Sequence, residues 1–172
     1  MTAPTIHFVI GSTGAGKTTF AQALARDERA LVFSIDTWMQ GLFGADLAGS
    51  TDFAQIAARA NRARKLMWEV AGQALALGVP VVFDSGLLTA ADRADARATA
   101  RMLGYPQQTH YVATPVDIRW ARVSARNANR DGAYAFEITR PMFDFIERIW
   151  QAPDADEIAD EEFVVTGAEA TA

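Results

Sequence analysis

The chain of 172 residues contains no cysteine, which excludes disulfide bonds and thiolate metal sites. It also has no apolar run approaching the roughly 20 residues that a membrane-spanning helix requires. The apolar run near the N-terminus is short and no basic segment precedes it, so we expect no secretory leader. These absences predict a soluble, cytoplasmic protein without a membrane partner.

Lysine is scarce, and positive charge is not in excess. Of 16 basic residues only Lys17 and Lys65 are lysine, and the formal net charge is −5. Such a balance gives no general attraction to nucleic acid, although it leaves room for a local basic groove near Arg59, Arg62 and Arg64. An apolar content of 50% is enough for the core of one domain. No repeat or long linker divides the chain, so we expect a single domain over residues 1–172.

One segment carries a highly specific motif. Residues 11–18 read Gly-Ser-Thr-Gly-Ala-Gly-Lys-Thr and fit the phosphate-binding pattern G-x-x-x-x-G-K-[ST]. Glycines let backbone N–H groups wrap a triphosphate, Lys17 reaches the β- and γ-phosphates, and the Thr18 hydroxyl binds Mg²⁺. The residues predicted to bind the nucleotide are Gly11, Ser12, Thr13, Gly14, Ala15, Gly16, Lys17, Thr18 and Thr19.

The hydrophobic pattern places this motif between a strand and a helix, as a phosphate loop requires. Short apolar runs predict strands over residues 5–10, 31–35, 79–83, 109–113 and 162–166. Helical patterns cover residues 18–27, 53–77, 89–103, 115–129 and 139–150. Alternation of strands and helices predicts an α/β fold, a parallel sheet with helices on both faces. The glycine-rich segment 40–53 is expected to be irregular, the acidic segment 154–162 a solvated connector, and residues 167–172 a frayed tail.

Two aspartates follow predicted strands, at the sheet edge where such folds bind ligands. Asp84 would hold Mg²⁺ opposite Thr18; alternatively it forms the turn before Gly86. Asp36 would take a proton from an attacking hydroxyl as general base; alternatively it caps a helix beginning at Thr37. The two interpretations of Asp36 are compatible.

Arginines recur at helical spacing in two places. Arg119, Arg122, Arg126 and Arg130 would lie along one side of a helix, either as a lid over the phosphates or as a solvated face. Arg93, Arg97 and Arg101 repeat every four residues beside Asp92 and Asp95, which predicts a salt-bridged surface. Arg93 is the one of these three that we expect nearest to a site.

Other conspicuous side chains have less specific interpretations. His7 and His110 lie in predicted strands, and we expect them to be packed rather than catalytic. Trp38, Met39, Leu42 and Phe43 would form either the apolar walls of an acceptor pocket or part of the core.

Taken in order, these motifs resemble the small P-loop kinases of the zeta-toxin-like and chloramphenicol-phosphotransferase-like group, which includes the kinase domain of phage polynucleotide kinase. The similarity runs from Ile6 to Val165 and rests on the phosphate loop, Ser34-Ile35-Asp36, Phe83-Asp84-Ser85-Gly86 with Arg93, and Arg122-x-x-x-Arg126. The resemblance implies a five-stranded parallel sheet of order 2-3-1-4-5 and a lid over about residues 115–140. It implies transfer of the γ-phosphate of ATP to a hydroxyl, with Asp36 as base and Arg122 and Arg126 on the phosphates. Chains of this kind often carry the label AAA family ATPase.

The sequence thus favours an ATP- and Mg²⁺-dependent kinase with a small-molecule hydroxyl acceptor. A polynucleotide 5′-hydroxyl kinase and a nucleotide-binding regulatory ATPase with a protein partner remain as alternatives. Neither the acceptor, the preference for ATP over GTP, nor the oligomeric state follows from the sequence.

Overall fold

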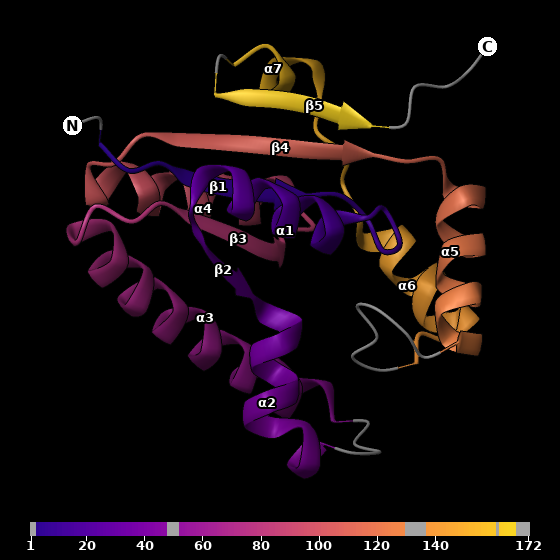
Figure 1. Ribbon diagram of the computed structural model, residues 1–172. Helices are drawn as coiled ribbons and strands as arrows, with labels where there is room; N and C mark the ends of the chain where they lie inside the picture. The colour runs from indigo at the N-terminus through magenta and orange to yellow at the C-terminus, as the bar shows by residue number, and fades with distance from the viewer. Residues whose placement is uncertain (1–2, 48–51, 130–136, 161, 168–172) are drawn as a thin grey trace.

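The computed structural model describes residues 3–47, 52–129, 137–160 and 162–167. Its centre is a parallel sheet of five strands in the order β2-β3-β1-β4-β5, which confirms the predicted fold class and strand order (Figure 1). The strands are β1 Ile6–Ile10, β2 Leu31–Ser34, β3 Val81–Gly86, β4 Gln107–Ala113 and β5 Phe163–Gly167. All carboxyl ends point the same way, towards α5 and α6.

Helices cover both faces of the sheet because side chains of one strand point alternately to opposite sides. Phe8 and Ile10 of β1 pack with α3 and α4, whereas Val9 packs with α1. The helices are α1 Lys17–Glu28, α2 Ile35–Leu47, α3 Phe53–Ala76, α4 Ala90–Leu103, α5 Val116–Asn129, α6 Arg140–Ile149 and α7 Ala155–Ile158. Within the described ranges, no helix combines the length and the apolar character needed to cross a bilayer.

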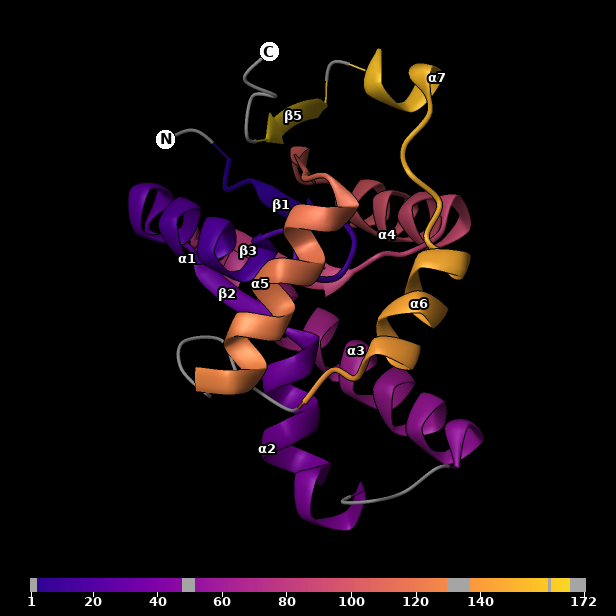
Figure 2. The ribbon, with the colours of Figure 1, turned by 90° about the vertical axis from the view of Figure 1, so that its right-hand side faces the viewer.

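Helix α5 stands at the carboxyl ends of the strands, beside α6 (Figures 1 and 2). A small apolar cluster joins the two, formed by Val123 and Trp120 of α5, Phe143 of α6 and Ile138 just before it. The Asn127 side chain adds two hydrogen bonds to the Ile138 backbone. Residues 130–136 of the expected lid, including Arg130, lie outside the described residues.

The expectation of irregular structure over residues 40–53 is wrong for its first part. Helix α2 continues to Leu47, with Gly41 and Gly44 inside it; residues 48–51 lie outside the described residues. Trp38, Met39 and Phe43 pack against the main core, which stabilises the helix in spite of its glycines. These three side chains are therefore core, and Leu42 is 52% exposed.

The acidic segment before β5 is not a solvated connector. Glu157 pairs with Arg93 at 2.6 Å, and Arg97 binds both Asp160 and Glu162. The arginines of α4 are thus salt-bridged as expected, but to carboxylates about 60 residues away rather than to Asp92 and Asp95. These ion pairs fasten the segment before β5 to α4.

Candidate functional site

The predicted phosphate loop lies between β1 and α1 and adopts a conformation that requires glycine. Gly14 and Gly16 have φ values of 79° and 100°, which side chains other than glycine rarely adopt. A Cβ atom on Gly14 would also lie 2.6 Å from the Arg119 carbonyl oxygen. No side chain caps the start of α1, so its first N–H groups are available to an anion.

Lys17 is the first residue of α1 and lies beside two carboxylates. Its ammonium donates a hydrogen bond to the Ser12 carbonyl, 3.0 Å away. Burial lowers the pKa of Lys17, while the negative charges of Asp84 and Asp36 oppose that change. A partly desolvated ammonium next to free helix N–H groups forms a site that a phosphate would complete.

Thr18 and Asp84 meet at the centre of the site. The Thr18 hydroxyl donates to Asp84 Oδ2 at 2.7 Å, and Asp84 is only 6% exposed at the carboxyl end of β3. Burial raises the pKa of Asp84, and the Thr18 hydrogen bond and Lys17 counteract this. One carboxylate and one hydroxyl oxygen fit Mg²⁺, which takes its remaining ligands from water and phosphates. The residues present therefore suit the predicted metal, and Asp84 is part of β3 rather than a turn.

Asp36 is an exposed residue in the first turn of α2. The helix begins at Ile35, and the preceding Ser34 hydroxyl faces the Thr37 N–H at 3.5 Å. The capping interpretation of Asp36 is therefore wrong. Its carboxylate lies on the same cavity as Lys17, Thr18 and Asp84.

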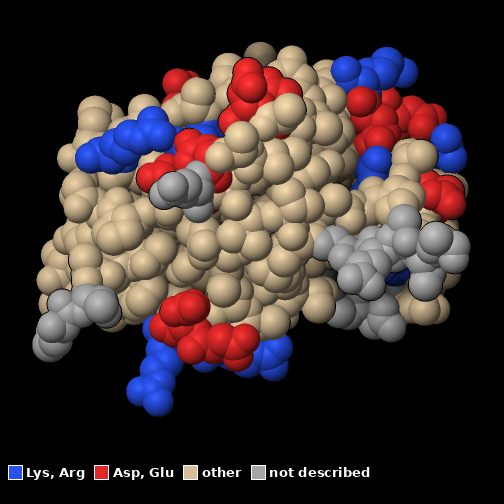
Figure 3. Space-filling model, turned by 90° about the horizontal axis from the view of Figure 1, so that it is seen from above, with Lys and Arg blue, Asp and Glu red and all other residues tan. Residues whose placement is uncertain are grey.

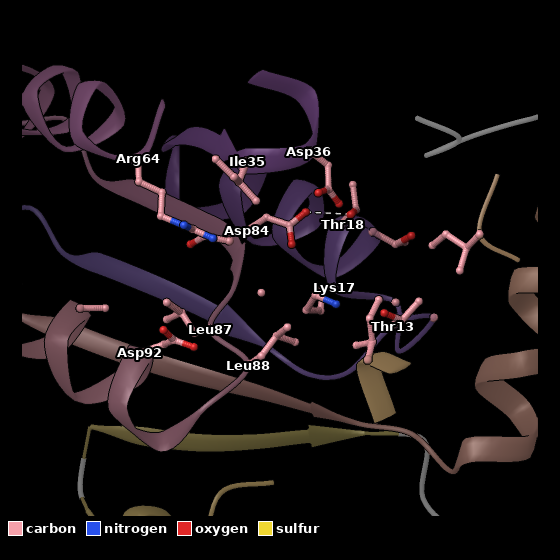
Figure 4. Close-up of a pocket in the computed structure, with 18 of the residues that line it drawn as sticks. Thr13, Lys17, Thr18, Ile35, Asp36, Arg64, Asp84, Leu87, Leu88 and Asp92 are labelled. Carbon is pink, nitrogen blue, oxygen red and sulfur yellow. Dashed lines mark hydrogen bonds between the residues drawn. The ribbon is translucent and has the colours of Figure 1, made fainter. Parts of the chain in front are cut away.

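A cavity of about 680 Å³ unites these residues. Figure 4 shows Asp36, Asp84 and Thr18 on one side of Lys17, with Arg64 from α3 and Asp92 from α4 further along the wall. Lining side chains include Thr13, Thr19, Asn61, Arg64, Trp68, Ser85, Leu87, Leu88, Asp92, Asp95, Thr99, Arg122 and Arg126. The cavity thus continues beyond the phosphate loop, between α3 and α4.

Two of the predicted lid arginines reach this cavity. Arg122 donates to the Ala15 carbonyl at 3.3 Å, and Arg126 lines the wall with its Nε buried and without a hydrogen-bond partner among the described residues. Arg119 differs, because it is buried and pairs with Glu147 of α6 at 2.5 Å. The expectation of four arginines on one functional face is therefore wrong for Arg119.

One residue expected near the site lies elsewhere, and the cavity contains others that the sequence did not indicate. Arg93 does not line the cavity; it is 1% exposed and bonded to Glu157 and the Gln151 carbonyl. Its neighbour Asp92 lines the cavity instead, while closing the capping box with Thr89 that starts α4. No motif marks Asp92 or Asn61 as a cavity residue, because their position relative to the phosphate loop depends on how α3 and α4 pack.

His7 and His110 are packed, as expected. They are 3% and 5% exposed, and His7 Nδ1 lies 3.0 Å from His110 Nε2 between β1 and β4. Neither lines the cavity described above.

Solved structures of similar fold are mostly kinases. A candidate kinase from Chloroflexus aurantiacus matches with a TM-score of 0.73 and 18% identity, over 97% of this chain and 86% of that one. Kti12 of Chaetomium thermophilum, in complex with ADP-AlF3, matches with a TM-score of 0.69 and 16% identity, over 95% and 89% of the two chains. The APS kinase CysC of Mycobacterium tuberculosis, with AMPPNP and APS, matches with a TM-score of 0.62 and 19% identity, over 98% and 91%.

Sequence identities of 16 to 19% show a common fold and do not show a shared activity or substrate. Among proteins of curated function, none matches the chain significantly. The family model described as "AAA domain" matches residues 6–144, which include the phosphate loop, Asp36, Asp84 and the arginines of α5. The chain therefore belongs to this AAA domain family of P-loop proteins.

Proposed function

We propose that this protein is an ATP-dependent kinase that transfers the γ-phosphate to a hydroxyl group of a small molecule. The observation that best supports this proposal is that the cavity beside the phosphate loop continues past Asp36, between α3 and α4. A phosphotransferase needs room for an acceptor next to the γ-phosphate, and a carboxylate within reach of the acceptor hydroxyl. The extent of this cavity and the position of Asp36 on it support the proposal.

Each part of the reaction has a candidate residue. The loop amides and Lys17 would bind the β- and γ-phosphates, and Thr18 and Asp84 would hold Mg²⁺, which would supply positive charge against those phosphates. The acceptor oxygen attacks the γ-phosphorus in line while the bond to the β,γ-bridging oxygen breaks and ADP leaves. Asp36 receives the hydroxyl proton. Arg122 and Arg126 stabilise the negative charge of the moving phosphoryl group.

The proposed acceptor end of the cavity carries charged side chains of both signs beside the apolar Trp68, Leu87 and Leu88. Arg64 and Asn61 of α3 are linked by a hydrogen bond of 3.0 Å, and Asp92 and Asp95 of α4 lie on the cavity as well. Groups of this kind bind hydroxyl-rich molecules, because hydroxyls both donate and accept hydrogen bonds.

The arginines considered for a polynucleotide acceptor, Arg59, Arg62 and Arg64, lie on α3 and have different surroundings. Arg64 lines the cavity, Arg59 lies over the Phe43 ring at 5.7 Å, and Arg62 is exposed and does not line the cavity. On the face seen in Figure 3, charged side chains of both signs lie in mixed groups separated by uncharged surface. This pattern is unlike the basic stripe of nucleic-acid-binding surfaces.

An ATP-consumption screen tests the proposal. The purified protein with Mg²⁺ is offered sugars, polyols, hydroxy acids, amino alcohols, hydroxylated antibiotics and 5′-hydroxyl oligonucleotides, and products are identified by mass spectrometry. We expect a phosphorylated small molecule. Hydrolysis that no acceptor increases would contradict the proposal and favour a regulatory ATPase, and phosphorylation of oligonucleotides alone would favour a polynucleotide kinase.

A further inference from the structure

Arg119 contacts the phosphate loop from outside, away from the cavity. Its Nη1 donates to the Thr13 carbonyl at 3.2 Å, and its Nε donates to the Thr114 carbonyl at 2.9 Å. The backbone at Arg119 lies so close to Gly14 that no side chain fits between them. Arg119 is 6% exposed, and its guanidinium lies over the Phe143 ring of α6 at 5.5 Å.

Glu147 completes this contact from α6. Its two carboxylate oxygens accept hydrogen bonds of 2.6 and 2.5 Å from Arg119 Nη1 and Nη2. The hydroxyl of Ser12, the second residue of the phosphate loop, also donates to Glu147 Oε1. Three parts of the chain, the loop, α5 and α6, therefore meet at one ion pair.

Two carbonyl groups on the outer side of the loop accept hydrogen bonds from side chains outside the loop. A loop whose N–H groups face a phosphate must turn carbonyls outward, and each buried carbonyl needs a donor. Arg119 serves the Thr13 carbonyl, while Thr114 and Arg122 serve the Ala15 carbonyl at 3.0 and 3.3 Å. All three donors lie at the end of β4 or on α5.

We propose that the Arg119–Glu147 ion pair is a positioning device for nucleotide binding, which holds residues 12–14 of the loop in the phosphate-binding conformation and fixes α5 beside it. Arg119 also neutralises a carboxylate that would otherwise face an anion site. Hydrogen bonds from Arg119 and Ser12 lower the pKa of Glu147, so this carboxylate is charged at neutral pH. This inference rests on the nucleotide-binding part of the proposed function.

Removal of Arg119 and removal of the Glu147 charge should affect nucleotide binding differently. Removal of Arg119 frees the Thr13 carbonyl and leaves the charge of Glu147 unpaired beside the triphosphate site. Additional removal of the Glu147 charge relieves the repulsion, which is long-ranged where water is partly excluded. A merely structural ion pair would affect unfolding but not nucleotide affinity.

Calorimetric titration with ADP and Mg²⁺ tests this, with melting temperatures measured for every variant. We expect R119M to weaken ADP binding roughly tenfold or more. The double variant R119M/E147Q should recover only the part of that loss that comes from the unpaired charge of Glu147, because it still lacks the ion pair that holds the loop. The matched control is R97M, because Arg97 is also buried (9% exposed) and paired with Asp160 and Glu162, yet does not line the cavity; it should lower the melting temperature and leave ADP affinity unchanged.

The outcomes separate this inference from the proposed function. Wild-type protein that does not bind ADP would overturn both. A folded R119M protein that binds ADP within twofold of wild type would overturn the positioning role alone. Failure of R119M/E147Q to bind better than R119M would overturn the charge-neutralising role of Arg119.

Discussion

Lys17 faces the proposed phosphate site, and its burial disfavours the charged ammonium in the unbound protein. Burial lowers the pKa of its ammonium, which means that the charged form is partly desolvated before a phosphate arrives. Such a side chain serves ligand binding more than folding. The same residue stands out in the sequence as one of only two lysines.

Lys17→Ala should therefore weaken Mg-ATP binding by about 30-fold or more without lowering the melting temperature. Isothermal titration and a thermal melt measure the two quantities. Lys65→Ala is the matched control, since Lys65 is exposed on α3 and does not line the cavity; it should bind ATP as wild type does. Unchanged affinity in a folded Lys17→Ala protein would refute the phosphate role.

Asp36→Asn tests the general base. An amide of the same size cannot take a proton, so phosphoryl transfer should fall by roughly 10²- to 10⁴-fold, or less because phosphoryl transfer has a loose transition state. ATP affinity and melting temperature should hardly change. Asp46→Asn, at an exposed position of the same helix, should keep full activity, and a fully active Asp36→Asn protein would remove Asp36 from the mechanism.

Most elements could be predicted from the sequence, because buried strands and amphipathic helices have distinct periods. Helix α2 could not, since Gly41 and Gly44 are poor helix formers and only packing of Trp38 and Phe43 on the core compensates for them. The ion pairs of Arg93 and Arg97 also escaped prediction. Their partners lie more than 60 residues away, and helical spacing reports only on neighbours.

Helix α5 carries the arginines that should act on the transferred group. Arg122→Ala and Arg126→Ala should lower turnover by roughly 10³-fold and change ATP affinity less, since contacts that strengthen in the transition state act on rate. Steady-state kinetics on an identified acceptor provide the measurement. Arg148→Ala, an exposed arginine on neighbouring α6, is the control. Wild-type turnover in both α5 variants would make these arginines surface residues only.

The histidine pair between β1 and β4 should make stability depend on pH. Burial lowers the pKa of His110 to about 4 and also lowers the pKa of His7. Both side chains are therefore neutral in the folded protein at neutral pH. As the pH falls through 6.5, the unfolded chain binds protons that the folded chain does not, and stability decreases. Between pH 6.5 and 5 His110 should contribute a loss of the order of 2 kcal/mol. Urea unfolding at several pH values should show this dependence in wild type and a weaker one in His110→Gln; parallel curves would refute it.

Across the whole molecule, the chemistry of the proposed site and its specificity come from different levels of structure. The phosphate loop, Asp36 and Asp84 lie at the carboxyl ends of β1, β2 and β3, so the sequence alone predicts that they meet at one sheet edge. The walls at the acceptor end come from α3 and α4, where Arg64 and Asp92 lie. The position of these walls depends on how the helices pack across the sheet, and the hydrophobic pattern of the sequence does not predict that packing. The fold and the place of the proposed site are therefore predictable from this sequence, and the acceptor is not.

Nucleotide binding should stabilise the entire chain, because the site joins the loop, β3 and α5, which separate on unfolding. A ligand that binds only the folded state at 100 times its Kd adds about 2.7 kcal/mol, which raises the melting temperature of a chain of this size by roughly 5–10 °C. We expect Mg-ATP to produce this shift. Removal of Mg²⁺ with EDTA should abolish most of it, since the charges of the β- and γ-phosphates would then face Asp84 and Asp36 without a cation.

Asp84→Asn provides the internal test: it should lose the dependence on Mg²⁺ while retaining a small shift with ATP through Lys17. Scanning calorimetry measures the shift that ATP produces in wild type and in Asp84→Asn, each with and without Mg²⁺. An equal shift for wild type with and without Mg²⁺ would contradict a metal site at Thr18 and Asp84.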